Sequence, residues 1–406
     1  MTNKLKEKQI IFFLNWVQGW ERALTGGDRI WTELAKRWKT KTNLTIIGSE
    51  GALKIAEQNY VTGIEKIISS GNIKDKNNLS IFVLFKNTVK RIFLGNIALN
   101  KFLKNRRIDF LYSTSDFPAD SLPAFFIKIR HPEIIWIAGY YLFVSPPWKA
   151  DSPYKGKTAL RGFVYWLSQI PTLFYIKHFA DFVFVTSEPD VKKFITPKRD
   201  KNKIIVVRGG VDTSESKKYL RLKKDPIERK KYLACFVGRL HYQKGVLELI
   251  DIWKNVVKIK PQAKLAIIGN GPLEKEMKDK IAQLKLEKNI DLLGFKDGKE
   301  KYEIFKNSKT VVHPAIYDSG GMAAAEAMAW GLPGISFDLE ALKTYYPKGM
   351  IKTPCFDLNQ FAQNIINLDE DKILYKKISL QAIDLINSQW DWNKRAQDIF
   401  EKVFLC

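Results

Sequence analysis

The segment from Tyr317 to Pro333, YDSGGMAAAEAMAWGLP, holds the residue types and spacing best suited to chemistry in this chain. It sets a glycine turn, Gly320-Gly321, at the start of a predicted helix, and free backbone N–H groups at a helix N-terminus attract phosphate. Asp318 precedes the turn and Glu326 lies eight positions further on, inside the helix. A carboxylate so placed can accept hydrogen bonds from a ribose diol. The segment therefore predicts part of a site for a sugar nucleotide.

Both carboxylates also have a purely structural interpretation. Asp318 would serve as a helix N-cap, and Glu326 would lie on a solvated helix face. The residues around Glu326 are nearly all apolar: Ala324, Ala325, Ala327, Met328 and Ala329. A carboxylate in so apolar a helix is costly unless it is paired or meets a ligand. We therefore predict a functional role for Glu326, and for Asp318 beside it.

A second loop, from Val237 to Gly245, carries two cations directly after a strand-like run. Arg239 offers a forked guanidinium and Lys244 a compact ammonium, a combination that suits a diphosphate. Gly238 allows the backbone to come close to a ligand. The alternative is a pair of solvated surface cations, but the flanking glycines and the position after a strand favour a binding loop.

Three further loops follow predicted strands. Gly26 and Gly27 stand in Thr25-Gly26-Gly27-Asp28 ahead of a helix, Gly271 stands in Ile268-Gly269-Asn270-Gly271-Pro272, and Phe295 ends Leu292-Leu293-Gly294-Phe295, where it would edge a nucleobase. Each of these loops is also compatible with an ordinary turn.

The elements that would position these loops alternate between strands and helices, which predicts parallel sheets with helical crossovers. The predicted strands are Ile10–Leu14, Leu44–Gly48, Leu79–Phe85, Asp109–Ser113, Ile134–Ala138, Phe182–Thr186, Leu233–Val237, Lys264–Ile268, Ile290–Leu293, Thr310–Val312 and Gly334–Phe337. We expect two doubly wound domains, residues 1–205 and 206–380, and a C-terminal helix at 381–406 that packs back on the first. Ligands of such sheets bind at the C-terminal ends of the strands, so the expected site is the cleft between the domains.

Composition fits this organisation. The chain has 406 residues, 45% of them hydrophobic, which suits two domains better than one. No apolar run approaches the roughly 20 residues needed to span a bilayer, and the polar start MTNKLKEKQI does not resemble a signal peptide. The three cysteines form no metal-binding pattern, so we expect reduced thiols and no metal site.

The chain carries a formal charge of +24, and residues 1–205 hold +16 of it. Such a surplus attracts polyanions: nucleic acid, an anionic membrane face or phosphorylated substrates. It can also serve solubility alone. No helix-turn-helix, zinc or RNP-type pattern is present, so we expect no nucleic-acid partner.

In this order the motifs resemble those of the retaining GT-B glycosyltransferases, the group that includes sucrose synthase, sucrose-phosphate synthase and phosphatidylinositol mannosyltransferase. The motifs are Gly26-Gly27, Val237-Gly238-Arg239 with Lys244-Gly245, Gly269-Asn270-Gly271-Pro272, Leu293-Gly294-Phe295, and Asp318 with Glu326-Ala327-Met328-Ala329-Trp330-Gly331-Leu332-Pro333. The resemblance is strongest from about Ile204 to Ser336 and weaker in the N-terminal half.

The resemblance implies an acceptor-binding N-terminal domain and a second domain that binds a nucleotide-diphosphate sugar. Arg239 and Lys244 would hold the diphosphate and Glu326 the ribose hydroxyls. Asp318 and the amides of Gly320, Gly321 and Met322 would hold the sugar and the distal phosphate, while Gly27 would close on the phosphate from the other domain. It further implies a hexosyl transfer with retained configuration that needs no metal and no cofactor besides the donor.

Two departures from the family pattern are present. The first carboxylate is usually Glu, and here it is the shorter Asp318. A His often follows the strand that matches Ile134–Ala138, and here Gly139-Tyr140-Tyr141 follows, so we name Tyr140 and Tyr141 as candidate acceptor contacts. A nucleotide-sugar epimerase or hydrolase, or a catalytically inactive scaffold of the same fold, therefore remains an alternative.

The stretch Phe82–Arg107 is basic and rich in apolar residues at helical spacing. Such a segment can lie on an anionic membrane surface, although an ordinary surface helix has a similar composition. We expect a cytoplasmic protein, peripheral at the inner face of the membrane, whose acceptor is a lipid-linked or membrane-surface glycan.

Overall fold

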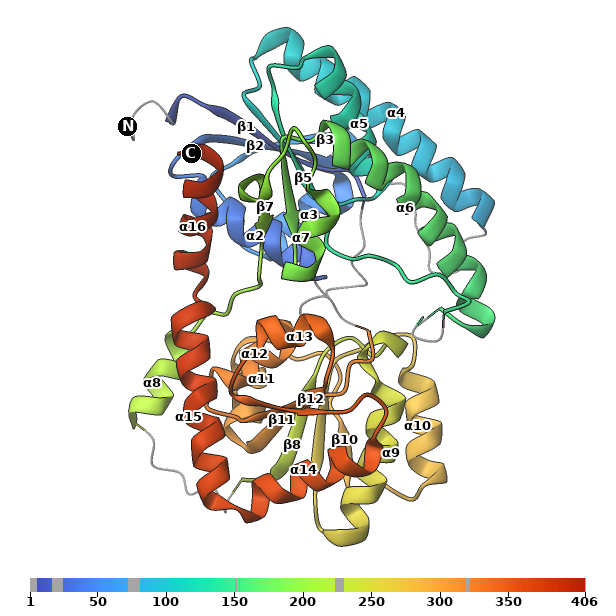
Figure 1. Ribbon diagram of the computed structural model, residues 1–406, viewed down its shortest axis with the longest axis vertical. Coiled ribbons are helices and arrows are strands. Elements are labelled where there is room, and N and C mark those ends of the chain that lie inside the picture. The colour runs from blue at the N-terminus through green and yellow to red at the C-terminus, as the bar shows by residue number, and fades with distance from the viewer. Residues whose placement is uncertain are drawn as a thin grey trace. The chain divides into compact units, whose positions relative to one another are not determined.

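The computed structural model describes residues 6–16, 25–71, 81–149, 152, 154–222, 230–317 and 322–405. The chain divides into two compact units, which Figure 1 shows. Unit 1 is Met1–Val207 with Asn393–Cys406, and unit 2 is Arg208–Trp392. Each unit is built on its own parallel sheet.

The sheet of unit 1 has seven parallel strands in the order β3-β2-β1-β4-β5-β6-β7. They are β1 (Gln9–Leu14), β2 (Asn43–Ser49), β3 (Glu65–Ser70), β4 (Phe110–Ser113), β5 (Ile135–Gly139), β6 (Phe182–Val185) and β7 (Ile204–Val206). Parallel neighbours need crossover connections, and helices supply most of them. The order reverses between β1 and β4, so polar residues after these strands meet at one edge.

The helices of unit 1 are α2 (Gly26–Trp38), α3 (Glu50–Gln58), α4 (Ile81–Asn105), α5 (Pro118–Arg130), α6 (Ala159–Phe179) and α7 (Glu188–Phe194). Helix α2 starts with a capping box: the Thr25 hydroxyl accepts a hydrogen bond from the Asp28 N–H, and the Asp28 carboxylate accepts one from the Thr25 N–H. This exchange satisfies two N–H groups that a helix start otherwise leaves open. It fixes the chain at Gly26-Gly27.

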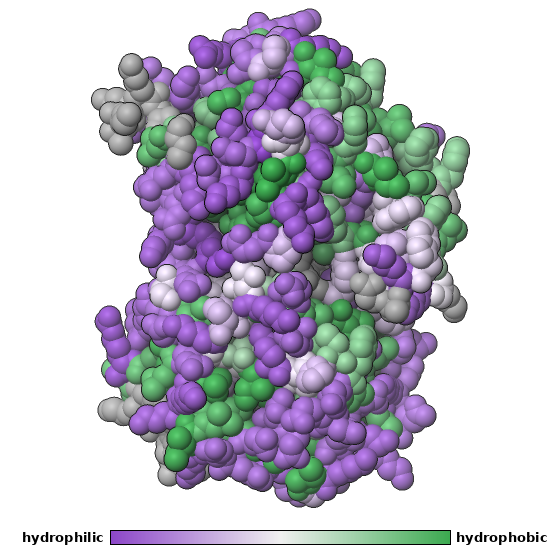
Figure 2. All heavy atoms as spheres, viewed as in Figure 1, coloured by the Kyte–Doolittle hydropathy of each residue, from purple (hydrophilic) through white to green (hydrophobic). Residues whose placement is uncertain are grey.

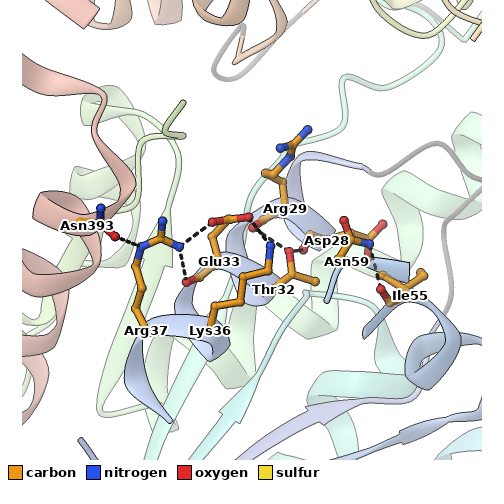
Figure 3. Close-up of polar contacts among 9 residues, drawn as sticks. All are labelled: Asp28, Arg29, Thr32, Glu33, Lys36, Arg37, Ile55, Asn59 and Asn393. Atoms are coloured by element: carbon orange, nitrogen blue, oxygen red, sulfur yellow. Dashed lines mark hydrogen bonds and ion pairs between the residues drawn. The ribbon is translucent and has the colours of Figure 1, made fainter. Parts of the chain in front are cut away.

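The last helix, α16 (Trp392–Phe404), packs on α2 of unit 1. The Trp38 indole N–H donates to the Ala396 carbonyl at 3.0 Å, and its ring meets Phe404 edge-on at 5.2 Å. Arg37 Nε donates to Asn393 Oδ1 at 2.8 Å, and Arg37 is itself held by Glu33 (Figure 3). The returning segment starts at Asn393, twelve residues after the boundary that the sequence suggests.

The sheet of unit 2 has six parallel strands in the order β10-β9-β8-β11-β12-β13. They are β8 (Tyr232–Val237), β9 (Leu265–Ile268), β10 (Ile290–Leu292), β11 (Ser308–His313), β12 (Gly334–Phe337) and β13 (Met350–Thr353). The order reverses between β8 and β11. By the general rule for open parallel sheets, a ligand of unit 2 binds where the loops after these two strands diverge.

The helices of unit 2 are α8 (Ser214–Leu222), α9 (Val246–Ile259), α10 (Glu274–Gln283), α11 (Gly298–Lys306), α12 (Met322–Met328), α13 (Glu340–Tyr345), α14 (Leu358–Glu370) and α15 (Lys372–Gln389). Two clusters of buried side chains pack around this sheet. One centres on Trp253 of α9, the other on Trp330 and Trp390. These cores make the sheet a rigid platform for its loops.

The two doubly wound parallel sheets confirm the predicted α/β class. One predicted strand, Leu79–Phe85, is wrong. Its residues 81–85 are helical and begin α4, while residues 79 and 80 lie outside the described part of the chain. The apolar run resembles a strand, but its hydrophobic spacing continues at three and four residues. Strands β3 and β13, each at a sheet edge, and most of β7 were not predicted.

Candidate functional site

Four loops of unit 2 gather at the C-terminal edge of its sheet. They follow β8, β9, β10 and β11, and each contains a motif that the sequence indicated. The loops after β8 and β9 are joined by three backbone hydrogen bonds: Gly238 N–H to Ile268 O, Leu240 N–H to Asn270 O and Leu273 N–H to Leu240 O, at 3.0, 2.9 and 3.2 Å. The Gly269 N–H reaches the Gly294 carbonyl at 2.9 Å and ties in the third loop.

The fourth loop is held to the first. The Gln243 carbonyl accepts hydrogen bonds from the N–H groups of Ile316 and Tyr317 at 3.1 and 3.3 Å. Gly245 adopts φ +62°, and a Cβ there would lie 1.9 Å from the Pro314 carbonyl oxygen. Only glycine fits this close approach. The loops therefore form one connected surface.

Gly269 is the tightest point of this surface. Its φ is +147°, and a Cβ would lie 1.8 Å from the Gly238 carbonyl oxygen. Gly294 nearby also has a positive φ, +67°, but a Cβ there would meet nothing within 4 Å. A side chain at Gly294 would therefore cause backbone strain alone, whereas one at Gly269 would cause both backbone strain and a steric collision.

We expect Gly269→Ala to lower the free energy of unfolding by about 3 kcal/mol or more, because it adds a collision to the strain of a positive φ. Gly294→Ala is the matched control and should cost only about 1 kcal/mol. Urea unfolding of the two variants compares them directly. Equal losses would show that the approach of Gly269 to Gly238 is not a constraint.

Arg239 and Lys244 lie on either side of His241 in the loop after β8, and both are half-buried. Burial of the His241 ring lowers its pKa to about 4, and the positive charges of Arg239 and Lys244 act in the same direction. The ring is therefore neutral at pH 7, and it accepts a hydrogen bond from the Gln243 N–H at 3.3 Å. The positive charges of Arg239 and Lys244 both act at His241, so the loop has the concentrated positive charge that a diphosphate needs. Sequence reasoning did not single out His241.

Glu326 lies on α12 and is paired. Its Oε2 is 2.8 Å from Nζ of Lys301, which is also 2.8 Å from Oδ1 of Asp297. The side chains of Lys301 and Glu326 are 9% and 22% exposed. Burial alone would lower the pKa of Lys301, but the carboxylates of Glu326 and Asp297 outweigh it and raise that pKa. The pair fixes the Glu326 carboxylate within α12, the helix that follows the fourth loop.

The sequence carried no signal for Lys301, since it stands in a run of lysines and acids that resembles a solvated helix. Of the other predicted donor contacts, Asp318, Gly320 and Gly321 lie outside the described residues. Met322 begins α12, and a Cβ on Gly209 would lie 1.9 Å from its Sδ, so the segment entering unit 2 packs against this helix start. A Cβ on Gly271 would lie 2.4 Å from the Leu240 carbonyl oxygen, so this glycine packs closely against the first loop. Phe295 is exposed in the third loop.

In unit 1, the loops at the C-terminal ends of β4 and β5 and the start of α2 come together. A Cβ on Gly27 would lie 3.3 Å from Cδ2 of Tyr141, so these two candidates from distant parts of the sequence are neighbours. The hydroxyls of Tyr141 and Tyr112 are hydrogen-bonded, and burial raises the pKa of Tyr141 above its ordinary value. Gly26 is exposed at the N-terminus of α2.

Tyr140 is buried in the hydrophobic core of unit 1. Its ring packs against Phe143 at 4.5 Å and against Phe194 at 5.2 Å. Alternation along the chain turns Tyr140 inward and Tyr141 toward Gly27. We therefore keep Tyr141 as a candidate acceptor contact and do not carry Tyr140 further.

Two buried carboxylates that the sequence did not indicate lie on the same edge of unit 1. Burial raises the pKa of Asp120 to about 7 although it accepts hydrogen bonds from Asn15 N–H and Trp16 N–H, both at 2.6 Å. Burial raises the pKa of Asp116 to about 6, and Gln169 Nε2 donates to it at 2.8 Å. Both carboxylates fasten the loops around Tyr141.

Part of unit 2 matches a known protein family. Residues 220–384, which contain Arg239, Lys244 and Glu326, match the family described as glycosyl transferases group 1. The amylovoran biosynthesis glycosyltransferase AmsD of Erwinia amylovora is 31% identical over 159 residues, which are 39% of this chain and 44% of that protein. Three such relatives at 31% to 37% identity are matched over only 26% to 44% of their own length.

Two solved structures share the fold of the whole chain. Anabaena Alr3699/HepE in complex with UDP-glucose superposes with a TM-score of 0.68 at 16% identity and covers 98% of this chain and 100% of that one. Sucrose-phosphate synthase of Thermosynechococcus elongatus gives 0.70 at 14% identity, with coverage of 97% and 98%. The chain therefore has the GT-B fold, and the group 1 glycosyltransferase match lies in unit 2.

Proposed function

We propose that this protein is a glycosyltransferase that moves a hexosyl group from a nucleotide-diphosphate sugar to a hydroxyl acceptor with retained anomeric configuration. The observation that carries the proposal is the single surface on unit 2 formed by four loops, with Arg239, Lys244 and Glu326 on it. The family match over residues 220–384 and the UDP-glucose bound by a protein of the same fold support a sugar nucleotide as ligand.

In this proposal each group on the surface has a distinct task. Arg239 and Lys244 bind the diphosphate, and the loop glycines let the backbone approach it. Lys301 holds one oxygen of Glu326 at 2.8 Å, and the oriented carboxylate accepts hydrogen bonds from the ribose hydroxyls. Phe295 edges the base. Asp318 and the amides of Gly320, Gly321 and Met322 bind the sugar and the distal phosphate.

The proposed reaction needs no protein nucleophile. The bond between the sugar C1 and the diphosphate oxygen breaks while the acceptor oxygen attacks from the same face. The acceptor proton passes to the leaving phosphate oxygen, so atoms and charge balance. Arg239 and Lys244 stabilise the negative charge that develops on the diphosphate, which is the task a metal ion performs in other phosphate sites. We therefore propose that the reaction is independent of divalent metal.

The test is to identify the product of transfer by NMR. Incubation with the donor that binds and an acceptor alcohol should give a glycoside with the anomeric configuration of the donor, at an unchanged rate in excess EDTA. Loss of activity that magnesium restores would contradict the metal-free proposal. A free sugar or an epimerised nucleotide sugar, without glycoside, would favour the hydrolase or epimerase alternative.

We propose that the acceptor is a lipid-linked or membrane-surface glycan met at the cytoplasmic face of a membrane. Support comes from α4, which is basic and exposes apolar side chains. Tyr141 beside Gly27 is the candidate contact for that acceptor on unit 1.

A further inference from the structure

Helix α4 of unit 1 has apolar side chains on two opposite faces. One face is buried and includes Leu99 and Phe102. The outward face carries a stripe of exposed apolar residues at spacings of three and four: Phe82, Phe85, Val89, Phe93 and Ile97. Phe82 is 75% exposed. A surface helix of a water-soluble protein normally turns polar residues outward, so this stripe needs an apolar environment or a partner.

Helix α6 also turns apolar side chains outward. Its buried face holds Tyr175 and Ile176 together with the polar residues Gln169 and Thr172, which are only 6% and 1% exposed. Gln169 is fully used: it donates to Asp116 at 2.8 Å and to the Leu142 carbonyl at 2.7 Å, and accepts from the Val144 N–H at 2.9 Å. The outward face is apolar, with exposed Leu160, Phe163, Val164, Leu167, Ile170 and Phe174. Phe174 is 62% exposed. A helix that turns this many apolar side chains outward fits a lipid-facing position.

The two helices lie on either side of α5, which packs against both. Half-buried Phe125 and Phe126 and exposed Ile129 of α5 fill the space between the stripes. Beyond α6, exposed Trp148 meets the Trp166 ring edge-on at 5.0 Å. Figure 2 shows apolar residues gathered where Figure 1 places α4 and α6. We call this surface, formed by the outward stripes of α4 and α6 with Trp148, the α4–α6 face.

The charges around the α4–α6 face have one sign. No Asp or Glu occurs from residue 81 to 108 or from 152 to 180. The cations in these segments include Lys86 and Lys90, which stand next to the apolar stripe of α4, and Lys101 and Lys104 further along the same flank. Arg161 is exposed near the start of α6. Apolar rings beside several cations complement a surface that is hydrocarbon below and anionic at its headgroups.

We infer that the α4–α6 face of unit 1 binds the surface of an anionic lipid bilayer, with its rings in the headgroup boundary and its lysines on the phosphates. Among the described residues no helix is long and apolar enough to cross a membrane. A second copy of the chain is a poor occupant, because two faces that carry only positive charge repel each other. The inference deepens the proposed function by placing the acceptor in a lipid surface, but the binding needs no transfer reaction.

The test is flotation with vesicles of phosphatidylcholine alone and of phosphatidylcholine with phosphatidylglycerol, without any substrate. We expect the full chain to float with the anionic vesicles and much less with the neutral ones. Lys86→Gln/Lys90→Gln/Lys101→Gln should reduce the partition by about 100-fold, at roughly fivefold for each lysine. Phe85→Ser/Phe93→Ser/Phe174→Ser should abolish flotation.

The matched control is Phe356→Ser/Ile373→Ser, which removes two exposed apolar side chains of unit 2 and should leave flotation unchanged. Melting temperatures check that every variant is folded. Equal flotation with the two vesicle types, or unaltered flotation of the α4–α6 variants, would overturn the inference. It would also be overturned if sedimentation showed that the wild type is a dimer and that the three phenylalanine substitutions convert it to a monomer. Donor binding measured in parallel separates this failure from a failure of the proposed function.

Discussion

Replacing both Arg239 and Lys244 with alanine is expected to weaken the binding of a nucleoside diphosphate by about 1,000-fold. Each cation makes charge-assisted hydrogen bonds to phosphate worth about 1.5–3 kcal/mol, and the variant removes two of them. Each single variant should lose about 10- to 100-fold. Isothermal titration calorimetry measures the dissociation constants.

Lys254→Ala is the matched control, since Lys254 is an exposed cation further along α9 and should leave the affinity unchanged. A second readout is the imidazole of His241, followed by NMR. Its pKa is lowered to about 4 by burial and by the two cations, so their removal should raise that pKa. In the wild type, a bound diphosphate should raise it too. A raised pKa with an unaltered dissociation constant would show that the two cations act on His241 but hold no diphosphate.

Replacing Glu326 with alanine is expected to lower the affinity for the nucleotide sugar by about 100-fold, because the ribose hydroxyls lose a charged acceptor. It should also lower the free energy of unfolding, because buried Lys301 loses the carboxylate of Glu326 and keeps the ion pair with Asp297. Breaking a buried ion pair costs about 3–5 kcal/mol. These two effects can be separated in the same protein.

The double variant Glu326→Ala/Lys301→Met removes both charges. We expect it to recover most of the stability lost in Glu326→Ala but none of the donor affinity. Glu300→Ala is the control, because Glu300 pairs with Lys296 on the exposed side of α11 and should change neither quantity. Donor affinity that returns in the double variant would mean that Glu326 acts only as the partner of Lys301.

Much of this site follows from the sequence, because its motifs depend on glycines and on the alternation of strands and helices. The loops after β8, β9 and β10 were identified as candidates, each with an ordinary turn or surface loop as the alternative. What a single loop could not reveal is that Gly269 is required by the Gly238 carbonyl, 1.8 Å from where a Cβ would stand. That constraint exists only when two loops distant in sequence meet.

The features that the sequence did not reveal depend on pairing across the fold. Lys301 resembles the solvated lysines around it until α11 and α12 bring it to Glu326. The outward apolar stripe of α6 could not be predicted because both sides of the helix mix residue types. The buried residues include the polar Gln169 and Thr172 beside Tyr175 and Ile176, so the sequence pattern does not show which side faces the core. Strands β3 and β13 lie at the sheet edges, where only part of each strand is fully buried and the hydrophobic signal is weak.

If the loops of unit 2 bind a nucleotide sugar through Arg239 and Lys244, the ligand should stabilise the folded protein. The melting temperature of the wild type and of the Arg239→Ala/Lys244→Ala variant would be compared with UDP-, GDP-, ADP- and TDP-sugars and with the free nucleoside diphosphates. A ligand that binds the folded state raises the melting temperature by mass action. The account predicts a rise with the sugars and diphosphate of one base in the wild type and none in the variant. No rise with any of them, or an equal rise in both proteins, would contradict it.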